Sequence, residues 1–206
     1  MFGQIRSPLR KPFQMDEKVK LLVDSFGNDK VKLNELVSEH TALHLGGPAK
    51  LFFVATHVQE IIRMVELAKS LRIPVIVFGT GSKMIISDKG FDGVIVKNRT
   101  AGMVVVGVKG KVSKEGIGVS EAMIEVESGV SISRLIEFLK KQGLNTDLLN
   151  EIKGSLGGNL FLTKALLDQT QKVKIIDETG EITEIKKEDL SLQKHIILSA
   201  VLKFRV

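Results

Sequence analysis

The amino-acid sequence predicts an α+β fold in two parts, and two observations carry this prediction. Between residues 51 and 78, a strand, an amphipathic helix and a second strand follow one another, which is the pattern of a βαβ unit. After about residue 98, short apolar strands alternate with turns, as in antiparallel sheets. We therefore expect an N-terminal arm and short helix in residues 1–30, a βαβ subdomain in 31–97 and an α+β subdomain in 98–206.

Composition excludes several classes of protein. The 206 residues include 30 Lys and Arg against 24 Asp and Glu, a net charge of +6, and no Cys, Trp or Tyr. Without cysteine, disulfides and thiolate chemistry are impossible. Several of the ten Phe lie in apolar runs typical of a core, so we expect a nucleotide-sized anion rather than nucleic acid as the partner. Neither a signal peptide nor an 18-residue apolar stretch occurs, so we expect no membrane contact and a cytoplasmic protein.

The N-terminal elements follow from caps and hydrophobic spacing. Residues 1–14 lack periodicity and are interpreted as an arm. Asp16 can cap a helix over Glu17–Phe26, and Gly27 is a suitable helix end. A polar stretch follows, for which no strand is predicted.

The βαβ unit begins with a strand over Leu51–Ala55. Thr56-His57-Val58-Gln59 is interpreted as a capping box that opens a helix. Its apolar residues recur at helical spacing. Val75–Phe78 is a short apolar run typical of a buried parallel strand, and Phe91–Val96 supplies another strand.

The second subdomain is predicted to open with strands at Met103–Val108 and Met123–Glu127, separated by the Gly- and Lys-rich stretch Gly110–Val119. Either Ser131 or Ser133 caps the helix that comes next.

The C-terminal elements begin with a glycine-rich segment, Asn150–Asn159, from which a helix is expected to run to about Lys172. Strands at Val173–Ile176 and Ile182–Ile185 flank a turn sequence and predict a hairpin. Ile196–Phe204 is the last predicted strand.

The loop after the strand Val75–Phe78 is the first candidate site. In Gly79-Thr80-Gly81-Ser82, two glycines allow backbone N–H groups to converge on an anion, and Ser82 adds a hydroxyl. Met84 stands where a Rossmann fingerprint has its third glycine, and no Walker A motif occurs. The motif alone leaves two interpretations open, a phosphate-binding loop and an ordinary tight turn.

A second glycine-rich segment, Lys153-Gly154-Ser155-Leu156-Gly157-Gly158-Asn159, precedes the predicted helix. Its backbone amides could form another anion cradle, assisted by the helix N-terminus. A glycine-rich linker is the alternative interpretation. Leu45-Gly46-Gly47-Pro48-Ala49 is interpreted by itself as a turn.

In their order and spacing these segments resemble the UDP-N-acetylenolpyruvoylglucosamine reductase family (MurB). The resemblance covers roughly residues 38–206. It implies an α+β, two-subdomain FAD-binding fold of the vanillyl-alcohol-oxidase (PCMH) type. Members of that family are oxidoreductases that use NADPH to reduce the enolpyruvyl group of a UDP-sugar in peptidoglycan synthesis for the cell wall. The segments that carry the resemblance are Thr41–Ala49, Ile73–Ser82, Phe91–Ile95, Val126–Ser131, Lys153–Asn159, Val173–Ile185 and Ile196–Ala200.

The resemblance implies FAD as the cofactor and NADPH as an electron donor. It places the FAD pyrophosphate on the backbone of the first loop, and the rest of the cofactor against two further segments. The implied cofactor-binding residues are Gly79, Thr80, Gly81, Ser82, Lys83, Met84, Gly129, Val130, Gly154, Ser155, Gly157, Gly158 and Asn159.

The sequence also departs from the family pattern. Lys83 and His44 stand where the family has Asn and Arg, respectively, and Lys83 adds a positive charge near the implied phosphates. The family's Tyr-Arg pair lies before the strand that aligns with Ile196–Ala200, but here Leu190–His195 leads directly into that strand. The family's proton-donating Ser and a Glu lie in a further domain that binds the UDP-sugar and would begin after Val206.

We therefore expect an FAD-binding flavoprotein that does not by itself perform the NADPH-dependent reduction, with no catalytic residue assigned. A partner protein would then supply the substrate domain. Two alternatives stay open: a non-enzymatic binding or structural module that has lost flavin, and a divergent active reductase. Lys194 and His195 lie near the lost pair, but the simpler interpretation is exposed residues in a tight connection. His40 and His44 lack an accompanying ligand pattern, so no metal site is expected.

Overall fold

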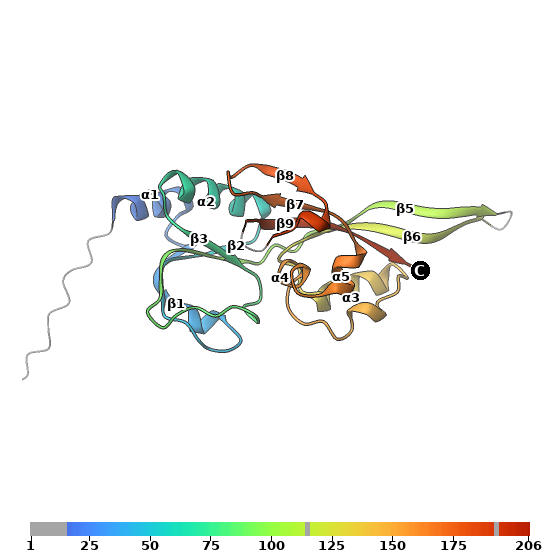
Figure 1. The fold of residues 1–206 in the computed structure, drawn as a ribbon, viewed down its shortest axis with the longest axis horizontal. Helices are drawn as coiled ribbons and strands as arrows, with labels where there is room; N and C mark the ends of the chain where they lie inside the picture. The colour runs from blue at the N-terminus through green and yellow to red at the C-terminus, as the bar shows by residue number, and fades with distance from the viewer. Residues whose placement is uncertain (1–15, 114–115, 192–193) are drawn as a thin grey trace, which may run out of the picture.

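The computed structural model describes residues 16–113, 116–191 and 194–206, which form two β-sheets (Figure 1). The arm expected over residues 1–14 lies outside these residues. The N-terminal sheet has the strand order β1-β2-β4-β3. Its strands are β1 (Val31–Leu36), β2 (Pro48–Ala55), β3 (Val75–Phe78) and β4 (Phe91–Asn98). β1 is antiparallel to β2, whereas β2 and β3 both run parallel to β4, which lies between them.

The C-terminal sheet has the order β5-β6-β9-β7-β8, and every neighbouring pair in it is antiparallel. The α+β fold is confirmed. The strands are β5 (Met103–Ser113), β6 (Gly116–Glu127), β7 (Thr170–Ile176), β8 (Ile182–Ile185) and β9 (Ile196–Arg205). The helices are α1 (Glu17–Phe26), α2 (Val58–Ser70), α3 (Ile132–Lys141), α4 (Leu156–Leu160) and α5 (Lys164–Gln169). Short 3-10 turns lie at Val37–His40, Asp147–Leu149 and Lys187–Asp189. No helix in the described part of the chain is both long and apolar enough to cross a membrane.

The first helix has the bounds that its caps predict. The Asp16 carboxylate accepts a hydrogen bond from the backbone N–H of Lys18, and α1 ends before Gly27, which has a positive φ of 87°. The second helix differs in detail, because its N-cap is His57 and the residue that completes the capping box is Glu60, not Gln59. The Glu60 carboxylate accepts from the backbone N–H groups of Thr56 (2.8 Å) and His57 (3.2 Å).

The charge of Glu60 gives α2 a pH-dependent stability. Burial disfavours this charge, but hydrogen bonds from the Lys30 ammonium and from the backbone of Thr56 and His57 outweigh burial and lower the pKa of Glu60 from 4.5 to about 2. Because the folded state lowers this pKa, the Glu60 carboxylate contributes to the free energy of unfolding above pH 4.5. This contribution is lost as the pH falls toward 2.

Glu60→Gln should therefore lower the free energy of unfolding by about 1 kcal/mol at pH 7, the usual scale of a helix cap. The difference from wild type should shrink below pH 4.5 and close near pH 2. Urea unfolding followed by circular dichroism at pH 7, 4 and 3 measures it. An equal difference at all three pH values would contradict a role for the charge.

The apolar core of the N-terminal part lies between its sheet and the helices α1 and α2, which pack on one face of that sheet (Figure 1). Helical spacing aims Ile61, Met64 and Val65 of α2 at the sheet, and all three are fully buried. Two residues of the C-terminal sheet join this cluster, Ile176 of β7 and Leu198 of β9. The two sheets are therefore packed together through apolar side chains.

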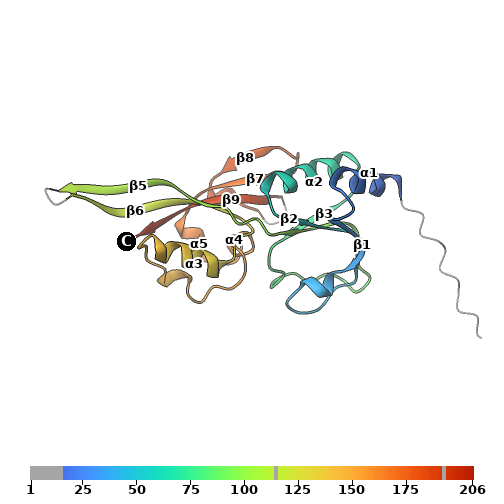
Figure 2. The same ribbon diagram turned by 180° about the vertical axis from the view of Figure 1, so that it is seen from behind.

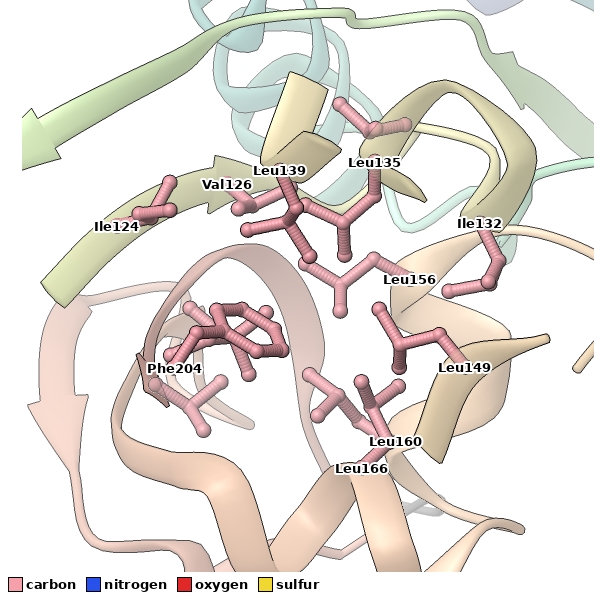
Figure 3. Close-up of a cluster of buried hydrophobic side chains, with 14 of the residues drawn as sticks. Ile124, Val126, Ile132, Leu135, Leu139, Leu149, Leu156, Leu160, Leu166 and Phe204 are labelled. Atoms are coloured by element: carbon pink, nitrogen blue, oxygen red, sulfur yellow. The ribbon is translucent and has the colours of Figure 1, made fainter. Parts of the chain in front are cut away.

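A second apolar core lies between the C-terminal sheet and α3 to α5 (Figure 3). Ser131, one of the two residues proposed as the cap, caps α3, and the helix buries Ile132, Leu135 and Leu139. These side chains meet Ile124 and Val126 from β6 and others that the figure labels. The remaining labelled members are Leu149, Leu156, Leu160, Leu166 and Phe204.

The strands β5 and β6 form a hairpin that extends away from the rest of the molecule in both ribbon views (Figures 1 and 2). The prediction that Gly110–Val119 separates two short strands is wrong, because the pairing continues to Ser113 and Gly116. Register shifts after Val105 and Lys109 accommodate the glycines within the ladder. β5 exposes Val106 (50%) and Val108 (60%).

Three other expectations are corrected. The single helix expected to reach Lys172 is instead the two short helices α4 and α5, and β7 begins three residues earlier than predicted, at Thr170. The polar stretch after α1 contains β1, in which Val31 is buried but Leu33 is only half-buried, so the apolar alternation is weak. Tertiary pairing with β2 decides the conformation there.

Candidate functional site

A cavity of about 750 Å³ lies between the two sheets, where β3 ends; we call it the larger cavity. Its volume is typical of a site for a small organic ligand. Residues 75–86, which include β3 and the first candidate loop, supply one side. The C-terminal part supplies Ser155, residues 157–159, residues 177–178 and residues 194–197. Eleven of the thirteen implied cofactor-binding residues belong to the two glycine-rich loops. Ten of these eleven line the larger cavity, and Gly154 is the exception.

The first loop, residues 79–84, passes close to the second loop, residues 153–159, at Gly79. A Cβ added to Gly79 would lie 2.1 Å from the Oγ and 2.7 Å from the Cβ of Ser155, whose side chain is 4% exposed. Gly81 has a φ of +71°, and a Cβ there would lie 2.6 Å from the carbonyl oxygen of His40. The two glycines are therefore needed where the first loop passes other backbone and a buried side chain.

Asn159 organises the second loop. Its side chain is 1% exposed, and its Nδ2 donates to the carbonyl oxygens of Lys153 (3.0 Å) and Ser155 (2.8 Å). Its Oδ1 accepts from the Nζ of Lys83 (2.6 Å) and the Oγ1 of Thr163 (3.2 Å). The hydrogen-bonding capacity of this amide is thus used in full, and the Lys83 contact joins the first loop to the second.

Gly129 and Val130, the other two implied residues, do not line the larger cavity. The carbonyl oxygen of Val130 accepts from Leu156 N–H (2.8 Å), while its side chain is 1% exposed in the C-terminal core. A Cβ on Gly129 would lie 2.4 Å from the Oδ1 of Asn98. This segment therefore supports the second loop through the hydrogen bond to Leu156 and does not border the larger cavity.

A smaller cavity of about 440 Å³ adjoins the same loops. Hydroxyl groups of Thr80, Ser82, Ser131 and Ser133 line it, together with Lys153 and Gly154 among others. Thr80 and Ser82 also line the larger cavity, so these two side chains lie between the two cavities. Their hydroxyl oxygens are 3.1 Å apart.

Lys194 and His195, interpreted from the sequence as exposed residues of a tight connection, both line the larger cavity. Lys194 is exposed, as expected, but His195 is half-buried. The Nδ1 of His195 accepts the backbone N–H of Ser191 (3.1 Å), and the Nζ of Lys194 lies 3.4 Å from a carboxylate oxygen of Glu178. Residues 192–193 of this connection lie outside the described part of the chain.

Five further polar residues that line the larger cavity were not anticipated, namely Lys69, Asn98, Ser128, Asp177 and Glu178. The Nζ of Lys69 on α2 donates to the carbonyl oxygens of Asp177 and Glu178, both at 2.9 Å, and joins the helix to the β7–β8 turn. Deeper in the fold, the Nδ2 of Asn98 donates to the Oγ of Ser128 (2.8 Å). No local sequence signal marks these contacts, because each joins residues at least 30 positions apart.

The ligand atoms of Glu35, Glu39 and His40 lie within 4.8 Å of one another, a grouping that the sequence did not suggest. We assign no metal to it. The hydrogen bond from Lys32 lowers the pKa of Glu35, and this ammonium supplies the positive charge that a metal ion would otherwise bring. His44, the other histidine considered in the sequence, is not part of the group.

The space around Gly154, between the two cavities, indicates what shape of ligand the site can hold. A Cβ on Gly154 would lie 3.1 Å from the Oγ of Ser82, 3.2 Å from the Nδ2 of Asn159 and 3.5 Å from the Oγ1 of Thr80. Gly154 thus leaves a polar cradle that a side chain would fill. Two neighbouring cavities with such a cradle between them fit an elongated ligand with a polar or anionic centre and larger groups at both ends, which is the shape of FAD.

Known proteins resemble this chain over most of its length. UDP-N-acetylenolpyruvoylglucosamine reductase from Clostridium tetani is 24% identical over 201 residues, which cover 88% of this chain and 60% of that protein. The enzyme of the same name from Chlamydia abortus is 30% identical over 166 residues, covering 78% of this chain and 52% of that protein. The chain thus spans little more than half the length of these relatives. The resemblance inferred from the sequence is confirmed.

Solved structures show the same fold. 4-Ethylphenol oxidase from Gulosibacter chungangensis matches with a TM-score of 0.65 at 15% identity, covering 91% of this chain and 42% of that one. p-Cresol methylhydroxylase matches with a TM-score of 0.60 at 12% identity, covering 91% and 42%. The predicted two-part flavoprotein fold of the PCMH type is therefore confirmed. The model of the FAD binding domain matches residues 49–186, more than half of the chain, and the chain accordingly belongs to the family of FAD-binding domains.

Proposed function

We propose that this chain holds FAD across the two cavities, with the diphosphate at the cradle formed by Thr80, Ser82, Gly154 and Asn159. The observation that carries the proposal is that the two cavities lie on either side of that cradle and share Thr80 and Ser82, because a single-phosphate flavin would use only one of them. In this proposal Gly129 and Val130 support the backbone of the second loop and do not contact the cofactor. Residues 31–97 supply the first loop and residues 98–206 the second, so both proposed subdomains contribute.

FAD supplies hydride and electron transfer when it is bound. The chain's own residues bind and orient it. In the larger cavity, β3 offers half-buried apolar side chains, and Phe161 and Leu162 add further apolar surface, which excludes water from an aromatic ring system. Lys194 and His195 border the same space, where their N–H groups can reach a bound ligand.

We further propose that the chain is the flavin-binding part of an NADPH-dependent oxidoreductase like its relatives, acting in the cytoplasm on a peptidoglycan precursor. The support is the similarity to the reductases from C. tetani and C. abortus. These 206 residues correspond to little more than half of either relative. We propose that groups outside these residues bind and protonate the substrate.

Calorimetry on flavin-stripped protein should show FAD binding at least tenfold tighter than FMN. The physical reason is that FAD fills both cavities and FMN only one, and a tenfold ratio corresponds to about 1.4 kcal/mol. Protein purified without stripping should also be yellow.

Two results would contradict the proposal. Equal affinity for FAD and FMN would show that the smaller cavity holds no part of the ligand. Failure of FAD to bind at tens of micromolar, by a protein whose circular dichroism shows it to be folded, would support the flavin-free binding module instead.

A further inference from the structure

Two lysines flank the cradle, one from each cavity. Lys83 lines the larger cavity and Lys153 the smaller. Both are tied to the buried amide of Asn159, since Oδ1 accepts from the Nζ of Lys83 and Nδ2 donates to the carbonyl oxygen of Lys153. The Asn159 side chain thus holds the ammonium group of Lys83 and the backbone of Lys153 beside the cradle.

The charges of these two lysines are not compensated by carboxylates. Among the residues that the structure describes, neither Lys83 nor Lys153 has a carboxylate oxygen within 4.0 Å, whereas Lys194 pairs with Glu178. Lys69, which also lines the larger cavity, donates hydrogen bonds from its Nζ to two backbone carbonyl oxygens. The Nζ of Lys83 donates one hydrogen bond to a neutral amide, which leaves two N–H groups for another acceptor.

We infer that Lys83 and Lys153 bind the diphosphate of the flavin dinucleotide, one from each cavity, and thereby favour an anionic dinucleotide over a neutral flavin. This inference rests on the proposed function. Each ammonium adds a charge-assisted hydrogen bond to the backbone cradle. Both side chains are exposed, so solvent screens them and each contributes a modest factor to affinity.

The test compares Lys83→Gln, Lys153→Gln and the double variant with wild type, using FAD and riboflavin as the two ligands. Glutamine removes the charge, and at position 83 it keeps an N–H donor for Asn159. Riboflavin has the same ring system without phosphate. The control is Lys20→Gln, an exposed lysine on α1 that lines neither cavity and changes the net charge equally.

Each single variant should weaken FAD binding about fivefold, and the double variant about 25-fold, while riboflavin affinity and the melting temperature stay unchanged. Raising the salt concentration should weaken FAD binding to wild type more than to the double variant. Lys20→Gln should match wild type throughout.

Two outcomes would overturn the inference alone. One is FAD affinity of the double variant within twofold of wild type. The other is an equal loss of FAD and riboflavin affinity, which would mean that the lysines only hold the loops in place. Wild-type protein that binds neither flavin would instead overturn the proposed function and this inference with it.

Discussion

The 206-residue chain loaded with FAD is expected to consume NADPH no faster with UDP-N-acetylenolpyruvoylglucosamine than without it. The sequence contains no tyrosine, so the family's Tyr-Arg pair cannot be present. Of the described residues between β8 and β9, those that line the larger cavity are Lys194 and His195. The loss of an electrophilic group and a proton donor costs about 10² or more each, which leaves a rate at least about 10⁴-fold below that of a complete enzyme.

An NADPH oxidation assay with and without the UDP-sugar measures this, with a full-length reductase from a relative as the control. The two losses need not multiply, so the product is a guide to scale. Substrate-dependent turnover within tenfold of the control would show that other groups in this chain perform both roles. In that case, loss of this turnover in His195→Asn would identify His195 as the proton donor, because Asn cannot exchange a proton near neutral pH.

The substitution Gly79→Ala is expected to weaken FAD binding about 30-fold. The added Cβ would lie 2.1 Å from the Oγ and 2.7 Å from the Cβ of Ser155. Rotation of the hydroxyl cannot relieve the contact with the Cβ, so the two loops must move apart at the cradle. Overpacking of this kind costs about 2 kcal/mol. The free protein can relieve it by moving the loops apart, but FAD binding requires their original spacing, so the cost falls on the bound state and corresponds to about 30-fold in affinity. Calorimetric titration with FAD measures it.

Two further variants make this result specific. Gly143→Ala introduces a Cβ that meets no atom within 4 Å, at a position that lines neither cavity, and should bind FAD within threefold of wild type. The double variant Gly79→Ala with Ser155→Gly removes the obstructing side chain and should recover most of the affinity. FAD binding by Gly79→Ala at the wild-type level would contradict the close approach of the two loops.

The sequence predicted correctly those helices and strands whose ends are set by residues within the element or next to it. Asp16 and Gly27 gave both ends of α1, and the uninterrupted apolar run Val75–Phe78 gave β3 with its observed bounds. In contrast, β1 and the outer half of the β5–β6 hairpin were missed, because weak alternation and glycines hide strands that pairing with a neighbour stabilises.

The candidate site divides in the same way. The two glycine-rich loops were found in the sequence, because an anion cradle requires glycine in a short stretch of chain. Their joining through Lys83 and Asn159, 76 residues apart, could not be predicted. Neither could the placement of Lys194 and His195 at the larger cavity, which depends on how the second sheet packs against the first.

The alternation of side chains along β7 and β9 has a consequence for how the molecule comes apart. Ile175 and Ile197 belong to the C-terminal core, while their chain neighbours Ile176 and Leu198 belong to the N-terminal core. Because successive side chains of a strand point to opposite faces, neither half can detach without exposing apolar surface of the other. The two halves form one cooperative unit. Separating the two halves would therefore uncover apolar side chains of both cores at once.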